Sequence, residues 1–214
     1  MSIKTYLFSA ALGLYAAAPV HAQVTYTYTG AALNSFFNGD PAHLVNSTGL
    51  LATFTFASAV ASNIGTTDNF AAAVPTSWSV TGGGYALNSS QPGAVLNGGP
   101  TPAALYVFTD VGGALLGWDF LATSIVNGEQ TGPTFRSFLY PTGQFSTSMP
   151  TIKTDVAAYW NMPTGVSTGE NTSVSGGAWT ISAVPEPSSL ALWMAGLVLL
   201  HWAAARRATA RSAR

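Results

Sequence analysis

The chain has 214 residues, of which only 7% are charged, and it has no cysteine, which excludes disulfides, metal–thiolate sites and thiol catalysis. The formal net charge is −1, but most basic residues lie near the two ends, and residues 23–183 hold two basic against seven acidic side chains, which gives −5. This acidic, cation-poor body argues against binding to nucleic acid or to anionic lipid headgroups.

The first 22 residues have the composition of a signal peptide. Lys4 precedes an apolar stretch at 6–18, and the small residues Val20 and Ala22 fit a signal-peptidase site. We therefore expect signal peptidase and the general export machinery to act on the chain, with Gln23 as the mature start. The alternative is an uncleaved N-terminal anchor.

The first half of the body has the pattern of β-strands. In segments 24–29 and 51–56, apolar or aromatic residues alternate with residues of the other face, mostly threonine, which is the period of a half-buried strand. Segment 78–80 repeats this alternation. The three glycines at 82–84 then predict a reversal into a strand at 85–87.

The second half of the body predicts a further hairpin and three more strands. A strand at 105–109, a turn at 110–113 and a strand at 115–121 form the hairpin, and its second strand should place three apolar residues on one face: Leu116, Trp118 and Phe120. Because the strand at 105–109 is apolar on both faces, we expect it to be central and covered. The further strands are expected at 135–140, 156–160 and 178–182, and the last should place Trp179 and Ile181 together.

No segment of the body shows a helical stripe. The alanine-rich stretch 57–73 is interrupted by Gly65 and a polar cluster at 66–69, so it predicts at most a turn of helix. Many short strands between turn residues indicate an all-β ectodomain over residues 23–183, an antiparallel β-sandwich or a jelly-roll-like domain.

Catalytic chemistry has few candidate residues. His43 is the only histidine of the body, and the chain has no Gly-x-Ser-x-Gly nucleophile elbow. One histidine without cysteine also argues against zinc or copper. A pair of carboxylates such as Asp119 and Glu129 could serve a glycosidase, but nothing in the spacing selects it. We therefore predict no catalytic residues and no metal site.

Calcium stays open as a ligand because oxygen donors are plentiful. The candidates are Asn38 and Asp40, Asp68 and Asn69, and Asp110. None forms an EF-hand, and such residues commonly make turns.

The aromatic residues allow a binding function. Six of them could form a sugar-stacking platform on one sheet face: Tyr26, Tyr28, Trp78, Trp118, Trp160 and Trp179. The competing interpretation, favoured for any single residue, is that the same side chains fill the core.

The end of the chain carries a proline motif, an apolar span and a basic stop. Residues 190–205 would form a helix of roughly 24 Å at about 1.5 Å per residue. This is a slightly short span for a hydrocarbon core about 30 Å thick. Because Arg206 and Arg207 follow it, the positive-inside rule predicts a basic cytoplasmic tail at 206–214 and an exported body.

This tail resembles that of the PEP-CTERM proteins of Gram-negative bacteria. The resemblance rests on the signal peptide, the span, the stop at Arg206 and Arg207, and a sorting motif at 184–189 that begins with Val184, Pro185, Glu186 and Pro187. It implies that an exosortase in the inner membrane recognises the motif and processes the chain at or near it. Both prolines favour an extended backbone at the residue before them, so the motif should be a stiff strand suited to a cleft.

Together these features predict an exported surface or extracellular-matrix protein without catalytic activity. The expected role is structural or adhesive and linked to exopolysaccharide, as in a biofilm. The alternative is a carbohydrate-binding, lectin-like module, and a secreted hydrolase is a distant third. The precursor should be anchored in the inner membrane with its body periplasmic, and should reach the cell surface or the medium after processing.

Overall fold

The computed structural model describes most of the body of the chain. Described residues are 23–37, 45–66, 69–97, 104–141, 151–161, 165–171, 177–183 and 196–199, with the backbone alone for 37, 161 and 165–171. Residues Val24–Ser182 form one compact unit. The other unit consists of Met1–Gln23 and Ala183–Arg214, where the described residues include a helical turn at 196–199.

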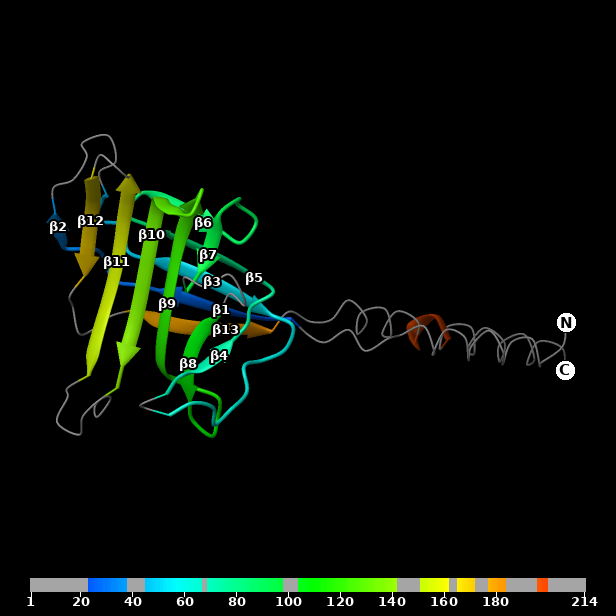
Figure 1. Cartoon of the computed structure of the whole chain (residues 1–214). Coiled ribbons are helices and arrows are strands. Elements are labelled where there is room, and N and C mark those ends of the chain that lie inside the picture. The colour runs from blue at the N-terminus through cyan, green and yellow to red at the C-terminus, as the bar shows by residue number, and fades with distance from the viewer. Residues whose placement is uncertain are drawn as a thin grey trace, which may run out of the picture. The chain divides into compact units, whose positions relative to one another are not determined.

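The compact unit consists of two antiparallel sheets, which confirms the all-β expectation (Figure 1). The strands are β1 (Val24–Thr29), β2 (Ser35–Phe37), β3 (Leu51–Phe56), β4 (Ala71–Ala73), β5 (Ser77–Gly82), β6 (Tyr85–Asn88), β7 (Ala94–Leu96), β8 (Leu105–Thr109), β9 (Leu115–Val126), β10 (Glu129–Tyr140), β11 (Ile152–Asn161), β12 (Gly165–Asn171) and β13 (Ala178–Ala183). The smaller sheet has the order β13-β1-β3-β5-β6, and the larger has β2-β12-β11-β10-β9-β8-β4, with β7 also on β9. In Figure 1 the long strands β9, β10 and β11 lie side by side in front of the smaller sheet.

The alternation of apolar and polar residues sets the inner face of the smaller sheet. In β1, Val24, Tyr26 and Tyr28 are buried and the two threonines between them are half-buried, as the period of two predicts. In β3, Ala52, Phe54 and Phe56 are buried in the same way. The two strands pair in the register that places Phe54 opposite Tyr26.

Aromatic side chains from both sheets meet in one core. Phe120 of β9 lies edge-on to Phe54 of β3, with ring centroids 5.2 Å apart, and 6.2 Å from Tyr28 of β1. Tyr28 also lies 5.4 Å from Trp118. Because these contacts join strands of different sheets, the two sheets pack face to face as in a sandwich.

The predicted glycine reversal at 82–84 is confirmed as the β5–β6 hairpin. Gly82 pairs with Tyr85, and the two residues between them, Gly83 and Gly84, have φ angles of +59° and +92°. A two-residue hairpin turn of this hand requires positive φ at both positions, where glycine has no steric cost.

Two predicted faces are wrong. Tyr106 of β8 is 39% exposed, so that strand is covered on one face only, although it lies between β4 and β9. Leu116 is 42% exposed while Trp118 and Phe120 are buried, because the register between β8 and β9 shifts between Phe108 and Thr109. The irregularity interrupts the strict alternation along β9.

Further differences concern strand ends and short strands. Ile181 of β13 is 53% exposed and does not share the half-buried position of Trp179. The stretch 57–73 has no described helix and ends in β4. Four strands were not predicted: β2, β4, β7 and β12.

Several predictions lie outside the described residues. These are the signal peptide with Ala22, the sorting motif at 184–187, and Arg206 and Arg207. Of the predicted span at 190–205, only 196–199 is described. Within the described segments, no helix has the length and apolar character needed to cross a membrane.

Truncating the aromatic centre of the core should destabilise the body strongly. Phe120 is fully buried between the sheets, so Phe120→Ala should lower the free energy of unfolding by about 3–5 kcal/mol. Urea denaturation of the full chain in detergent, followed by tryptophan fluorescence, measures this loss. Val111 is 83% exposed, and Val111→Ala should stay within about 0.5 kcal/mol of wild type. Equal effects of the two substitutions would contradict the packing.

Candidate functional site

The four tryptophans predicted as a stacking platform do not share a sheet face. Trp78 lies on β5 and Trp179 on β13 of the smaller sheet, whereas Trp118 and Trp160 lie on β9 and β11 of the larger. Trp78 and Trp118 are only 5% and 4% exposed, because both point into the core. Trp179 packs 5.2 Å from the core residue Tyr28, and Trp160 is half-buried. The predicted platform is therefore wrong for Trp78 and Trp118, and the core interpretation holds for Tyr26 and Tyr28 as well.

The carboxylates considered for catalysis lie far apart. Asp119 pairs with Phe138 near the open end of the β9–β10 hairpin, and Glu129 pairs with Val126 at its turn. Seven positions along β9 separate the two pairs, roughly 23 Å at about 3.3 Å per residue. Glycosidase carboxylates lie about 5–9.5 Å apart, so this pair cannot serve that reaction.

The described calcium candidate Asp110 is used in a turn. Its Oδ1 accepts hydrogen bonds from the backbone N–H groups of Gly112 and Ala114, at 2.8 and 2.9 Å. The other acidic candidates, Asp40 and Asp68, lie outside the described residues, as do Asn38 and His43. Among the side chains that the structure describes, no cluster of three His, Cys, Asp or Glu could hold a metal ion.

A buried polar cluster joins the two sheets. The Tyr28 hydroxyl on β1 lies 2.7 and 2.8 Å from the two carboxylate oxygens of Asp155 on β11, and it donates to that carboxylate. It also accepts the backbone N–H of Gly177, just before β13, at 3.1 Å. Tyr28 and Asp155 are 0% and 1% exposed, so these bonds form away from water.

Lys153 and Trp118 complete the buried cluster. Lys153 Nζ donates to the Gly177 carbonyl at 2.8 Å and lies 4.7 Å from the centre of the Trp118 ring. The indole N–H of Trp118 donates to Ser137 Oγ at 3.0 Å. A cation over an indole face is a favourable contact, which helps to hold Lys153 in the core.

Burial favours the neutral form of each titratable side chain in this cluster. It raises the pKa of Asp155, and hydrogen bonds from Ser137 and Tyr28 only partly offset this. Burial also lowers the pKa of Lys153, against the charge of Asp155. Burial and the charge of Asp155 raise the pKa of Tyr28 well above its ordinary value. Since none of its side chains is more than 7% exposed, the cluster stabilises the fold and offers no access to a substrate.

A second cluster lies on the outer face of the larger sheet, and we name it the outer strip. It consists of Tyr106 on β8, Asp119 on β9, and Arg136, Phe138 and Tyr140 on β10. Because Phe135 and Ser137 point into the core, the intervening residues of β10 point outward. Tyr106 and Phe138 pair with Asp119 from opposite sides, so the strip runs across three strands.

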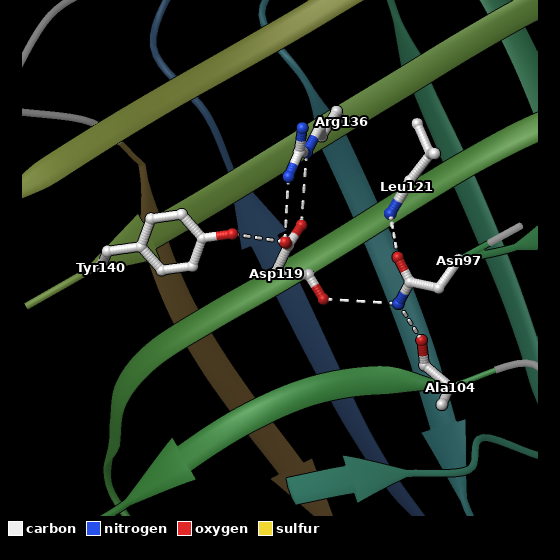
Figure 2. A network of polar contacts seen from close by, with 6 residues as sticks. All are labelled: Asn97, Ala104, Asp119, Leu121, Arg136 and Tyr140. Carbon is white, nitrogen blue, oxygen red and sulfur yellow. Dashed lines mark hydrogen bonds and ion pairs between the residues drawn. The ribbon is translucent and has the colours of Figure 1, made fainter. Parts of the chain in front are cut away.

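Asp119 is the centre of the polar contacts in the outer strip (Figure 2). Arg136 donates from Nη2 to Oδ2 at 3.1 Å and from Nε to Oδ1 at 3.4 Å. The Tyr140 hydroxyl donates to Oδ2 at 2.6 Å. Along β10 the planar groups stack, with the Arg136 guanidinium 4.8 Å from the Phe138 ring centre and the rings of Phe138 and Tyr140 5.0 Å apart.

Asn97 supports the strand that carries Asp119. Its side-chain Oδ1 accepts the backbone N–H of Leu121 at 2.6 Å, and its Nδ2 donates to the backbone carbonyls of Asp119, at 3.4 Å, and of Ala104 (Figure 2). Its own backbone N–H donates to Leu121 O. The amide thus replaces a strand neighbour between β7 and β8, and it fixes the backbone position from which Asp119 projects.

The outer strip combines exposed aromatic carbon with fixed polar groups. The side chains of Arg136 and Asp119 are 44% and 21% exposed, and Tyr106 is 39% exposed. Burial and the Asp119 carboxylate raise the pKa of Tyr140 to about 12, so its hydroxyl stays a donor near neutral pH. Burial alone would lower the pKa of Arg136, but the hydrogen bond and the charge of Asp119 outweigh burial and raise it. Such a surface can hold a polar, ring-shaped ligand, with hydrogen bonds beside aromatic faces.

The sequence contained one signal for the outer strip that the pattern analysis missed. Segment 135–140 has aromatic residues at both parities, Phe135 on one face and Phe138 and Tyr140 on the other. The only arginine of the body, Arg136, shares the second parity, and that marks this face as the exposed one.

Comparisons of the chain with protein-family models, with curated proteins and with solved structures find no significant match.

The buried Tyr28 hydroxyl should make stability fall at alkaline pH. Because the pKa of Tyr28 is raised on folding, its stabilising effect is present below pH 10 and is lost as pH rises towards its folded-state pKa. Tyr28→Phe should therefore show a shallower alkaline decline in the free energy of unfolding, measured by urea denaturation from neutral pH to pH above 10. It should also be less stable at neutral pH by about 1.5–3 kcal/mol, because the buried carboxylate of Asp155 loses one of its donors.

The matched control for this pH dependence is Tyr106→Phe, which removes a hydroxyl from an exposed ring. It should keep the wild-type alkaline slope. If Tyr28→Phe also keeps that slope, the buried hydroxyl does not govern it.

Proposed function

We propose that this protein is exported, sorted by an exosortase and used at the cell surface or in the extracellular matrix as a non-catalytic component that contacts exopolysaccharide. The observation that carries the contact is the outer strip, where Tyr106 and the Arg136–Asp119 pair are exposed together on one sheet face. In Figure 1 no described strand or helix lies in front of the outer face of β9, β10 and β11. Phe70, from the loop before β4, packs 5.7 Å from the Tyr140 ring at one end of the strip. A rigid aromatic and hydrogen-bonding surface is what a polysaccharide chain requires.

The adhesive and the carbohydrate-binding roles then share one surface, which is the outer strip and not the tryptophans. The buried tryptophans contribute to the core, while the strip supplies a donor fork at Arg136 and an exposed ring at Tyr106. The buried cluster around Asp155 supports a rigid platform, because it ties the two sheets behind that face. Rigid elements lose little entropy when a ligand binds.

The sorting part of the proposal rests on the sequence of the two ends. It comprises a cleaved signal peptide at 1–22, a motif at 184–189 and a membrane span at 190–205 with its basic stop. The precursor would be held in the inner membrane with the body in the periplasm, and the exosortase would then process it. In this role the chain is a substrate of the sorting enzyme and has no activity of its own.

Removing the sorting motif should block processing. Replacing Pro185, Glu186 and Pro187 together by alanine should leave a full-length, membrane-retained precursor, because an alanine segment has neither the extended backbone nor the charge. Cell fractionation and immunoblotting in an exosortase-containing host measure this. The matched control, Thr180→Ala with Ser182→Ala, changes two exposed residues just before the motif and should be processed normally. Release of the triple-alanine variant at the wild-type rate would refute the sorting proposal.

Removing the exposed ring should weaken polysaccharide binding. Full-length protein in detergent is passed over exopolysaccharide from the producing cells, immobilised on a sensor surface. Tyr106→Ala should raise Kd about tenfold or more, because burying an aromatic side chain contributes about 1.5–3 kcal/mol. Phe36→Ala removes a similarly exposed ring, 48% accessible, from β2 at the other edge of the sheet, and it should bind as wild type. Equal binding by both variants would place the contact elsewhere.

A further inference from the structure

We infer that the outer strip selects an uncharged glycan chain, at least two sugar residues long, and rejects acidic polysaccharides. This rests on the proposed polysaccharide contact and adds the chemical class of the ligand. It follows from where the cations of the body lie, how they are paired, and how the rings are spaced.

The body offers an anionic ligand almost no cation. Between residues 23 and 183 the only lysine and arginine residues are Lys153 and Arg136. Lys153 is 7% exposed, and its ammonium group donates a hydrogen bond to the Gly177 carbonyl. Arg136 is therefore the one accessible lysine or arginine of this segment, against acidic residues that give the body its net charge of −5. Long-range attraction of a polyanion is thus excluded.

Arg136 is itself neutralised by Asp119. Two of its nitrogens point to the two carboxylate oxygens, at 3.1 and 3.4 Å, so the pair has no net charge (Figure 2). A carboxylate of a uronic acid would have to displace Asp119 from Arg136. Hydroxyl groups of a neutral sugar can use the remaining donors and acceptors without breaking the pair.

The spacing of the rings sets the minimum length of the ligand. Tyr106 and Phe138 are in register with Asp119 on its two sides, so their backbones are two strand spacings, about 9–10 Å, apart. This distance exceeds the width of one sugar ring. A chain that stacks on Tyr106 and also reaches the Arg136–Phe138–Tyr140 row must therefore cross Asp119 with at least two residues.

The test compares neutral and acidic polymers on the full-length protein in detergent. Hydroxyethylcellulose, dextran and galactomannan are the neutral probes, and alginate and polygalacturonate are the acidic probes, each immobilised on a sensor surface. Wild type should bind at least one neutral polymer, with a Kd that changes less than about twofold when salt rises tenfold, since no net charge is screened. It should bind both acidic polymers at least tenfold more weakly.

Releasing Arg136 from its partner supplies the sharpest variant. Asp119→Asn keeps the size of the side chain and leaves an unpaired cation on the strip, so binding to alginate should strengthen at least tenfold and fall again with salt. Adding Arg136→Gln to Asp119→Asn should abolish that gain. Unchanged thermal unfolding midpoints show that both variants are folded.

The outcomes separate the two proposals. Salt-sensitive binding of wild type to alginate or polygalacturonate, tighter than to every neutral polymer, overturns the uncharged-ligand inference and leaves the polysaccharide contact standing. An Asp119→Asn variant that gains no alginate binding also overturns the inference, because the pair is then not what excludes acid. Failure of wild type to bind any of these polymers or the exopolysaccharide of the producing cells overturns the proposed function itself.

Discussion

The Tyr28 hydroxyl is the contact on which the arrangement of the two sheets depends. Tyr28 belongs to β1 of the smaller sheet, and its side chain spans the core so that the hydroxyl contacts both carboxylate oxygens of Asp155 on the larger sheet. A buried carboxylate without donors would destabilise the fold by several kcal/mol, so Asp155 needs the hydrogen bonds from Tyr28 and Ser137 once it is inside. The surrounding rings of Trp118, Phe120 and Trp179 lie 5.2 to 6.2 Å from the Tyr28 ring and exclude water from the bond. Apolar packing alone would allow the sheets to slide, whereas a directional bond between them fixes one registration.

The same contact determines what the outer face can be. Ser137 and Asp155 are paired opposite each other on β10 and β11 and both point inward, so Arg136 between the inward positions of β10 must point outward. The polar residues of the inner face and those of the outer face therefore occupy alternate positions along the same strands. A slip by one residue would bury Arg136 and expose Ser137 and Asp155 together. The rigidity of the outer strip is thus a consequence of the satisfied groups behind it.

Period-two alternation predicted β1, β3 and β5 because each has one clearly apolar and one hydroxyl-rich face, so the sequence states which side is inside. It failed where that contrast is missing. β12 consists largely of polar and glycine residues, Gly165–Asn171, and β4 is three alanines, so their pairing with longer neighbours stabilises them more than their own composition does. Leu116 was misplaced because the irregularity near Thr109 is a property of two strands together and leaves no mark in either sequence. The outer strip was missed for a related reason. The predicted platform contains all four described tryptophans of the body, and large rings are the ones that a core without disulfides most needs.

The position of Gly177 shows how the core reaches the strand that leads out of the body. Its N–H is held by Tyr28, its carbonyl is held by Lys153, and a Cβ there would collide with the backbone carbonyl of Thr29. β13 follows at once, at the edge of the smaller sheet, with most of its residues exposed. An edge strand has one neighbour only, so its own ladder of hydrogen bonds fixes it less firmly than a central strand is fixed. The hydrogen bonds that Tyr28 and Lys153 make to Gly177, the residue just before β13, compensate for the missing neighbour. This contact also explains why Lys153 is buried, although burying a lysine is costly. Its ammonium group reaches across the sheets and donates to a backbone carbonyl, which no apolar side chain could do.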